Sequence, residues 1–414
     1  IDKTSTKMGS RELRYRMTRP LIDKDILEKR YNNIEKFINN YEDYKVKLEK
    51  VIDVEKGIRK FYMKMLSPDM FANMDNSMNI IIEILNMNNT EQSIIKEFKK
   101  FHSYYHKQFD IDKMSNCKDF KVSFLKKGID TQIDTYDKFI FDIKKGLKDI
   151  ETMLENDKGV QVTLQPDNTF RTTKLAWNSI KNEDRKIVFR VGEEKRVTCE
   201  LKDFVNVENN KKSYVKLDNQ VVKKIINNLE NYEDIMSRLV KDKYYEICDY
   251  ILNNFNDIIK DVISIICDID ISVCGAIMCD RYKYTKPIIK DCDKSFISCK
   301  GIRHPIIERV NDKEQYISND LELDNMLLFG LNSSGKSSLL RSVGINIILA
   351  QMGFYVASDS FTYYPFNQII SKIGNSDDLF KGQSTFISEM IELKYILNNS
   401  DKNTLVLCDE LTSG

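Results

Sequence analysis

The sequence predicts a multidomain protein of the α plus α/β class, and three observations lead to this prediction. Apolar residues recur at alternating spacings of three and four over 133–154, 222–239 and 251–269, as in helices that pack along a seam. Short runs of alternating apolar and polar residues between 160 and 217 are typical of a small antiparallel sheet. An apolar run at 327–329 then leads through a glycine-rich turn into an apolar helix, which is the order of an α/β unit.

Residues 1–155 and 217–292 are predicted to be mainly helical. The first seam predicts a helix over 131–154, on the order of 35 Å long. The seam positions are Ile133, Tyr136, Ile140, Ile143, Leu147, Ile150 and Leu154, then Val222, Ile225, Leu229, Tyr232, Met236 and Leu239, then Ile251, Phe255, Ile258, Val262, Ile265 and Ile269. The core face of an ordinary helix bundle would show the same spacing, so that alternative stays open.

Residues 156–216 are predicted to form a small antiparallel sheet inserted between these helices. The expected strands cover 160–164, 186–191, 196–201 and 213–217. Cations are dense in this region, and phosphate contacts need cations but no sequence code. These cations are Lys181, Arg185, Lys186, Lys195, Arg196, Lys211 and Lys212. Acidic neighbours dilute them, and a solvated sheet surface is the alternative interpretation.

Residues 330–337 fit the pattern Gly-x-x-x-x-Gly-Lys-Ser, the phosphate-cradling P-loop. Gly330 and Gly335 permit backbone angles that side chains forbid, so that successive N–H groups can converge on phosphate oxygens. Lys336 can neutralise the β- and γ-phosphates, and we expect it to be catalytic. The Ser337 hydroxyl can ligate Mg²⁺. The apolar run 327–329 is predicted to be the buried strand that precedes the turn.

A second motif ends an apolar run at 404–408 with two carboxylates. Asp409 stands where a P-loop enzyme needs a partner for Mg²⁺. Glu410 can polarise an attacking water molecule and is the second expected catalytic residue. The two motifs in one chain predict nucleoside-triphosphate chemistry with ATP and Mg²⁺.

Four further segments carry a family resemblance. They are Arg303-His304-Pro305-Ile306-Ile307-Glu308, Tyr316-Ile317-Ser318-Asn319-Asp320, the stretch from Ile373 to Met390, and Met8-Gly9-Ser10-Arg11 with Arg19-Pro20-Leu21. Together they closely resemble the MutS family of DNA mismatch-recognition ATPases. The resemblance runs over nearly the whole chain and is most specific in 301–414. It implies a helical lever in 1–155, a β-rich clamp in 156–216, returning lever helices in 217–292 and a P-loop ATPase domain in 293–414. It also makes the seven cations between 181 and 212 the candidate DNA-binding residues of the clamp.

The resemblance also assigns individual roles. Tyr316 matches an aromatic residue that stacks on adenine, Asn332 an asparagine near the γ-phosphate, and Ser384 a serine that reaches the partner subunit's γ-phosphate. The implied nucleotide-binding set is Gly330, Asn332, Gly335, Lys336, Ser337, Ser338 and Tyr316. The loop reads Leu-Asn-Ser-Ser where the family usually has Pro-Asn-Met-Gly, so the loop geometry need not follow the family's.

The function implied is a Mg²⁺-dependent ATPase of DNA mismatch repair. It would act as a homo- or heterodimer that moves a clamp on double-stranded DNA, mismatched or branched. Family members usually begin with mismatch-reading and connector domains, so we expect a part of a larger protein, with a C-terminally incomplete ATPase domain and poor activity alone. Two alternatives stay open: a lever-bearing P-loop ATPase of recombination or chromosome maintenance, and a non-catalytic nucleotide-binding DNA clamp.

Composition limits the remaining possibilities. The net charge of +1 means that any nucleic-acid surface is local. Nine cysteines without a Cys-x-x-Cys pair predict reduced thiols rather than zinc ligands. No signal peptide or long apolar run is evident, so we expect an intracellular protein that neither is secreted nor spans a membrane. His102 and His106 are expected to be surface histidines, because no third metal ligand is evident near them in the sequence.

Overall fold

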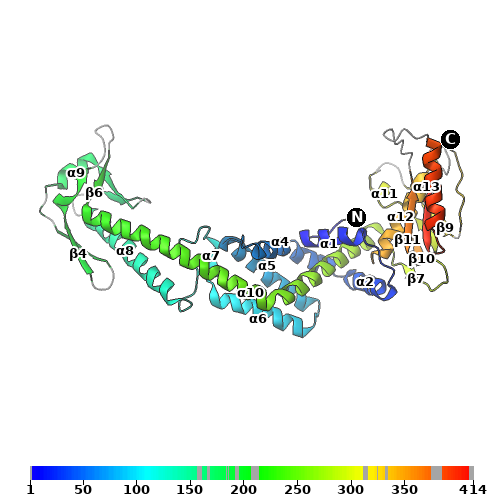
Figure 1. Ribbon diagram of the computed structural model, residues 1–414, viewed down its shortest axis with the longest axis horizontal. Helices are drawn as coiled ribbons and strands as arrows, with labels where there is room; N and C mark the ends of the chain where they lie inside the picture. The colour runs from blue at the N-terminus through cyan, green and yellow to red at the C-terminus, as the bar shows by residue number, and fades with distance from the viewer. Residues whose placement is uncertain are drawn as a thin grey trace. The chain divides into compact units, whose positions relative to one another are not determined.

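The computed structural model describes residues 2–155, 161–165, 168–182, 184, 186–191, 195–206, 214–310, 316–323, 325–331, 334–373 and 385–409 (Figure 1). The chain divides into two compact units. Unit 1 comprises Ile1–Glu55, Asn79–Gln92 and Lys260–Gly414, and unit 2 comprises Lys56–Met78 and Ser93–Ile259. This division does not test the four domain boundaries expected from the sequence, which stay a prediction.

Unit 2 is built mainly from helices, with short strands inserted between two of them. Its elements, some of which continue into unit 1, are α4 (Val54–Tyr62), α5 (Pro68–Met87), α6 (Gln92–Gln108), α7 (Ile111–Ser115), α8 (Thr131–Glu155), β1 (Val162–Leu164), β2 (Phe170–Thr173), α9 (Lys174–Ile180), β3 (Lys186–Val191), β4 (Lys195–Glu200), the 3₁₀ turn η1 (Leu201–Asp203), β5 (Val205–Asn206), β6 (Tyr214–Asp218) and α10 (Gln220–Tyr282).

Helices α8 and α10 pack together as the seam pattern predicted. Asp130 starts α8 by accepting hydrogen bonds from the backbone N–H groups of residues 132 and 133. Its apolar stripe is buried from Ile133 to Leu154. Lys144 Nζ lies 2.7 Å from Glu233 Oε1 of α10, and Figure 1 shows the two helices side by side. The predicted helix over 131–154 is therefore confirmed.

The second seam is wrong at one position and the third seam at two. Val240, Ile259 and Ile266 are buried, whereas the predicted Leu239, Ile258 and Ile265 are only partly covered. A straight α-helix has 3.6 residues per turn and drifts away from a strict heptad, so the buried stripe moves by one residue along α10.

The inserted strands form two antiparallel assemblies. One sheet has the order β1-β2-β6-β5, and β3 pairs with β4 as a hairpin. The four predicted antiparallel strands are confirmed within a residue or two of the expected bounds, but they belong to two assemblies and not to one sheet. The sequence pattern missed β2 and β5, because four- and two-residue strands are too short to show alternation.

Unit 1 combines helices with two small sheets. Its elements are α1 (Lys7–Met17), α2 (Lys24–Phe37), α3 (Tyr41–Leu48), the later part of α5, the end of α10, β7 (Ile288–Ile289), β8 (Phe296–Ile302), α11 (Ile307–Val310), β9 (Asn319–Leu323), α12 (Lys336–Gln351), β10 (Ser360–Tyr364), β11 (Gln368–Lys372), α13 (Thr385–Asn399) and β12 (Thr404–Cys408). The first sheet has the order β7-β10-β8-β9, and β11 pairs with β12 in parallel.

The core of unit 1 lies between α12 and the strands. Val343 and Ile347 of α12 share one buried apolar cluster with Leu405 and Leu407 of β12. The approach is close, because a Cβ on Gly344 would lie 2.8 Å from Leu407 Cδ1. A parallel strand covered by a helix is the expected core of an α/β unit.

The strand predicted at 327–329 is wrong. These residues form no strand, and the Leu327 and Phe329 side chains are 84% and 87% exposed. Apolar composition alone cannot supply the backbone partner that a strand requires, and none of the described strands pairs with this segment.

Two further expectations need correction. Helix α10 does contain an 18-residue window apolar enough to cross a membrane, but 72% of that window is buried inside the structure, as in the core helix of a folded protein. His102 and His106 are not isolated, because the Nε2 atoms lie 3.4 Å and 2.7 Å from Asp75 Oδ1. A carboxylate on another helix is not visible in the local sequence.

All nine cysteines lie among the described residues and stand as thiols. Cys292 alone of these nine is exposed, and Cys279 and Cys408 are partly covered. Burial raises the pKa of Cys267 and of Cys274 to about 12. These thiols are therefore protonated and unreactive in the folded chain.

Candidate nucleotide-binding site

The glycine-rich turn has the local geometry that its two glycines allow. Gly335 has φ of 94° and ψ of 12°, the left-handed region that L side chains rarely adopt. A Cβ on Gly330 would lie 2.9 Å from Ser334 Oγ. The backbone of the turn thus requires glycine at Gly335. Gly330 does not have the left-handed backbone that its glycine would permit, and the Ser334 hydroxyl near it belongs to an exposed side chain that can rotate away.

The turn ends at the open N-terminus of α12. This helix has 16 residues, begins at Lys336 and receives no side-chain cap from Gly335. The first N–H groups of a helix have no partner within the helix, and the helix dipole adds partial positive charge there. Ser337 and Ser338 lie in this first turn. The arrangement is suited to binding an anionic oxygen.

Lys336 folds back across the turn. Its Nζ donates hydrogen bonds to Gly330 O at 2.7 Å and to Leu331 O at 3.1 Å. The ammonium group is therefore held over the loop backbone, where a phosphate bound in the turn would offer stronger, charged acceptors.

Tyr316 forms a hydrogen bond with a residue of the same helix. Its hydroxyl lies 3.0 Å from Ser342 Oγ, and Ser342 in turn donates to Ser338 O at 2.8 Å. Six residues of helix separate Ser342 from Lys336, which is roughly 9 Å along the axis. The Tyr316 hydroxyl is thus held against α12 by a residue that the sequence did not single out.

Asp409 follows β12 directly. Its backbone N–H donates to Lys372 O at 2.8 Å, which extends the pairing of β11 and β12 by one step. Among the described residues, no hydrogen bond or ion pair joins Asp409 to Lys336 or Ser337. The packing of α12 against β12 places both motifs in one α/β unit.

The remaining predicted site residues are placed unevenly. Asn332, Ser384 and Glu410 lie outside the described residues, as do Arg185, Lys211 and Lys212 of the candidate DNA surface. Lys181 follows α9 and Lys186 begins β3, and both are exposed. Lys195 and Arg196 lie on β4, opposite residues 191 and 190 of β3.

One basic pair on the inserted sheet was missed. Arg171 of β2 lies directly opposite Lys216 of β6, so both side chains leave the same face of the sheet. The Arg171 guanidinium also lies 5.3 Å from the centre of the Tyr214 ring. Only the strand register brings these residues together, and the sequence does not contain that register.

The segment Met8-Gly9-Ser10-Arg11 has a structural explanation in unit 1. Gly9 packs against the buried Asp270 of α10, which also accepts hydrogen bonds from Ser5 and Thr6. Arg11 donates to both carboxylate oxygens of Asp53, at 2.8 Å and 2.7 Å. This segment therefore anchors the start of the chain to α10.

Comparison with known proteins assigns the family. Residues 1–276 match the family model for MutS domain III, and residues 326–414 match the model for MutS domain V. The chain belongs to the MutS family. The domain V match includes the whole glycine-rich turn and both carboxylates of the second motif.

Two named relatives are similar along the whole chain, and a third is similar over about half of it. A DNA mismatch repair protein mutS homolog of Acanthamoeba polyphaga mimivirus is 29% identical, and the alignment covers 100% of this chain and 43% of that protein. DNA mismatch repair protein MutS of Thermotoga maritima is 27% identical over 100% of this chain and 50% of its own length. A mitochondrial DNA mismatch repair protein mutS homolog of Sarcophyton glaucum is 35% identical over 47% of this chain and 20% of its own length. The chain thus spans about half the length of the MutS relatives that it matches throughout.

Proposed function

We propose that the chain is the lever, clamp and nucleotide-binding part of an ATP-dependent DNA mismatch repair protein. The observation that supports this most is the glycine-rich turn. Gly335 is left-handed, Lys336 Nζ is held over the loop, and the N-terminus of α12 is uncapped. This turn lies inside the domain V match of a MutS-family chain.

The proposed roles follow from the chemistry of each group. The N–H groups of Ser337 and Ser338 and the ammonium of Lys336 bind the phosphates. The Ser337 hydroxyl and the Asp409 carboxylate are oxygen ligands of the kind that Mg²⁺ prefers. When bound, Mg²⁺ neutralises charge on the phosphate oxygens. Tyr316 offers a ring face to the adenine.

Three residues outside the described part complete the proposal. Glu410 orients the attacking water, Asn332 contacts the γ-phosphate, and Ser384 reaches the nucleotide of a dimer partner. The protein then couples nucleotide state to clamp movement, which requires that ATP bind two conformations with different affinity. Helix α10 contributes residues to both units, which makes it a candidate for carrying this change.

The proposed partners are double-stranded DNA, mismatched or branched, and a second MutS-family subunit. The cations of the inserted sheet are the proposed contacts to the DNA backbone. An intracellular location is part of the same proposal.

The first prediction tests nucleotide binding in the complete gene product. Lys336→Ala removes the only side-chain cation of the turn, so we expect the affinity for Mg-ATP to fall by at least about tenfold. A fluorescent ATP analogue titrated at equilibrium measures this. Lys402→Ala, an exposed lysine before β12, is the matched control and should bind normally.

A companion variant separates binding from hydrolysis. Glu410→Gln keeps the size of the side chain and loses its charge, so ATP should bind while single-turnover hydrolysis slows strongly. Unchanged affinity in Lys336→Ala would refute the phosphate site. Unchanged turnover in Glu410→Gln would remove only that residue from the mechanism.

A further inference from the structure

Two helices of unit 2 bring a carboxylate and two imidazoles together. Asp75 is on α5, and His102 and His106 are one turn apart on α6. Asp75 Oδ1 lies 3.4 Å from His102 Nε2 and 2.7 Å from His106 Nε2. Among the described residues this is a group whose three potential ligand atoms all lie within 4.8 Å of one another.

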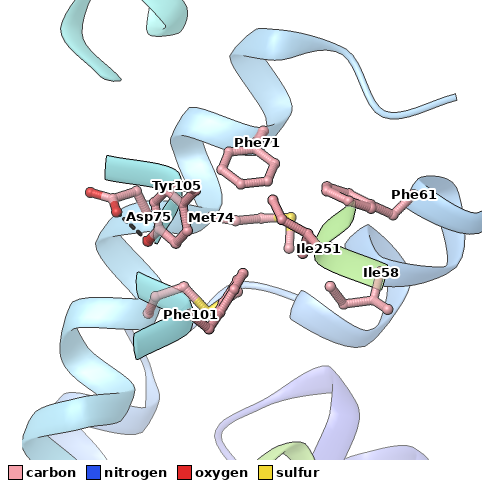
Figure 2. Close-up of a pocket in the computed structure, with 9 residues that line it drawn as sticks. Ile58, Phe61, Phe71, Met74, Asp75, Phe101, Tyr105 and Ile251 are labelled. Atoms are coloured by element: carbon pink, nitrogen blue, oxygen red, sulfur yellow. Dashed lines mark hydrogen bonds between the residues drawn. The ribbon is translucent and has the colours of Figure 1, made fainter. Parts of the chain in front are cut away.

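The cluster lies at the boundary between the core and solvent. Figure 2 shows Asp75 at the edge of a small cavity, with the Tyr105 hydroxyl bonded to its carboxylate at 2.5 Å. That cavity has a volume of about 10 Å³ and a mainly apolar lining, so it has no room for a ligand larger than one water molecule. The His102 and His106 side chains are 19% and 36% exposed.

The chemistry of the three side chains suits a cation. A carboxylate supplies negative charge and oxygen lone pairs, and a neutral imidazole offers a nitrogen lone pair to a metal ion.

Hydrogen bonding alone leaves the cluster poorly satisfied. Tyr105 and His106 both form hydrogen bonds with Asp75 Oδ1, which occupies the two lone pairs of that oxygen. His102 Nε2 is buried and makes no hydrogen bond to any described residue. A cation between the three groups would use both imidazole lone pairs and the carboxylate together.

We propose that Asp75, His102 and His106 form a binding site for a divalent transition-metal cation of the Zn²⁺ type. Two imidazoles and one carboxylate form a common three-residue ligand set for such ions, with a water molecule in the fourth position. Tetrahedral bonds of about 2.0–2.2 Å place ligand atoms about 3.3–3.5 Å apart, which the 3.4 Å separation of His102 and Asp75 already meets. His106 needs to retreat by less than about 1 Å.

The ion would link α5 to α6 inside unit 2. Tyr105 would keep its hydrogen bond to the carboxylate and orient it, as partners of metal ligands commonly do. Because the site requires two packed helices, the ion would bind the folded chain and raise its stability by mass action. Nothing in this proposal depends on nucleotide or DNA binding.

The chain provides its own control, because it has three histidines and the third, His304, lies in unit 1. The experiment titrates ZnCl₂ into the chain with isotope-labelled histidine rings, under reducing conditions, and follows the three ring signals by NMR. We expect the His102 and His106 signals to shift together and saturate near one equivalent, while the His304 signal stays in place.

Two variants and a second ion sharpen the test. His106→Gln should weaken zinc binding at least about tenfold and remove the zinc-dependent rise in melting temperature. Asp75→Asn should also weaken zinc binding and remove the zinc-dependent rise in melting temperature. If Asp75→Asn does not fold, the result for His106→Gln alone tests the proposal. Co²⁺ should give tetrahedral absorption bands without thiolate charge transfer. Zinc binding with unmoved histidine signals, or with thiolate bands, would assign the metal to cysteines and overturn the proposal, as would the absence of saturable binding.

Discussion

His304 illustrates how one buried side chain can make stability depend on pH. Its Nδ1 accepts hydrogen bonds from the backbone N–H groups of Ile306 and Ile307, both at 3.2 Å. Burial, with Arg341 nearby, lowers its pKa from the ordinary value of 6.5. Protonation would remove the acceptor and place a charge in a site that is 5% exposed.

We therefore expect His304 to stabilise the fold fully above about pH 6.5 and to lose this contribution as the pH falls through its lower folded pKa. The His304→Asn variant retains an acceptor near the position of Nδ1 and cannot titrate. Urea unfolding of both proteins at several pH values between 7.5 and 5 gives the difference between their free energies of unfolding. The other histidines titrate in both proteins, so their contribution cancels in this difference. A His304 pKa at or above 6.5 by NMR would contradict this.

Gly9 illustrates a position where one methyl group cannot be added. Asp270 Oδ2 accepts hydrogen bonds from the N–H and hydroxyl of Thr6, at 2.8 Å and 2.7 Å. A Cβ on Gly9 would lie 2.2 Å from that oxygen. The carboxylate cannot move without leaving buried donors unpaired.

Gly9→Ala should therefore lower the free energy of unfolding by about 1–3 kcal/mol, even though alanine favours helix by up to about 1 kcal/mol over glycine. Gly57→Ala is the matched control. Its Cβ would meet only the thioether of Met74, a flexible side chain that can turn away. Equal losses of stability in the two variants, measured by urea unfolding, would refute the explanation.

At the scale of elements, the pairing of α8 with α10 gives a direct test of the seam. Leu147 of α8 is 1% exposed, whereas Phe141 on the same helix is 65% exposed. Leu147→Ala should cost about 2–5 kcal/mol of unfolding free energy, because apolar burial is reduced and a cavity is left behind. Phe141→Ala should change stability by no more than about 0.5 kcal/mol. Urea denaturation followed by circular dichroism measures both. A larger loss in Phe141→Ala would mean that the opposite face of α8 is buried.

Local periodicity predicted some elements well and others poorly, for identifiable reasons. Helix α8 was predicted within one residue because its apolar stripe is a local pattern. The segment 327–329 failed because a strand needs a partner that the segment itself does not contain. The order of β1, β2, β6 and β5 could not be predicted, because it depends on pairing between residues far apart in the chain.

The same distinction applies to the candidate sites. Gly335 and Lys336 could be identified from the sequence because the residues of the turn are consecutive and form a recognisable motif. The contact between Tyr316 and Ser342, and that between Asp75 and the two histidines, join different elements and become visible only in the folded chain.

At the scale of the whole molecule, the net charge is only +1, so attraction to DNA has to come from a local group of cations. Charge reversal at Lys195, Arg196, Lys211 and Lys212 should weaken binding uniformly across DNA sequences. It should also flatten the dependence of affinity on salt, by about one unit of slope for each phosphate that the protein no longer neutralises. Fluorescence anisotropy at several salt concentrations measures both effects.

The control variant has the same net charge, but its four reversed lysines lie outside the inserted sheet. Reversal at Lys118, Lys121, Lys126 and Lys127, all exposed in unit 2, changes the net charge equally. If both sets of variants lose affinity alike, the effect belongs to the net charge of the molecule and the inserted sheet is an ordinary solvated surface.

Because only one thiol is exposed, a distance between the two units can be measured by fluorescence energy transfer without changing the sequence. Its single tryptophan, Trp177, is 6% exposed on α9 of unit 2. Its one exposed thiol, among nine that are all described, is Cys292 in unit 1. A thiol-reactive fluorophore should therefore couple to Cys292 in preference to the other thiols. Energy transfer from Trp177 to that dye would report the distance between the two units, with and without ATP, and no residue would have to be introduced for the measurement.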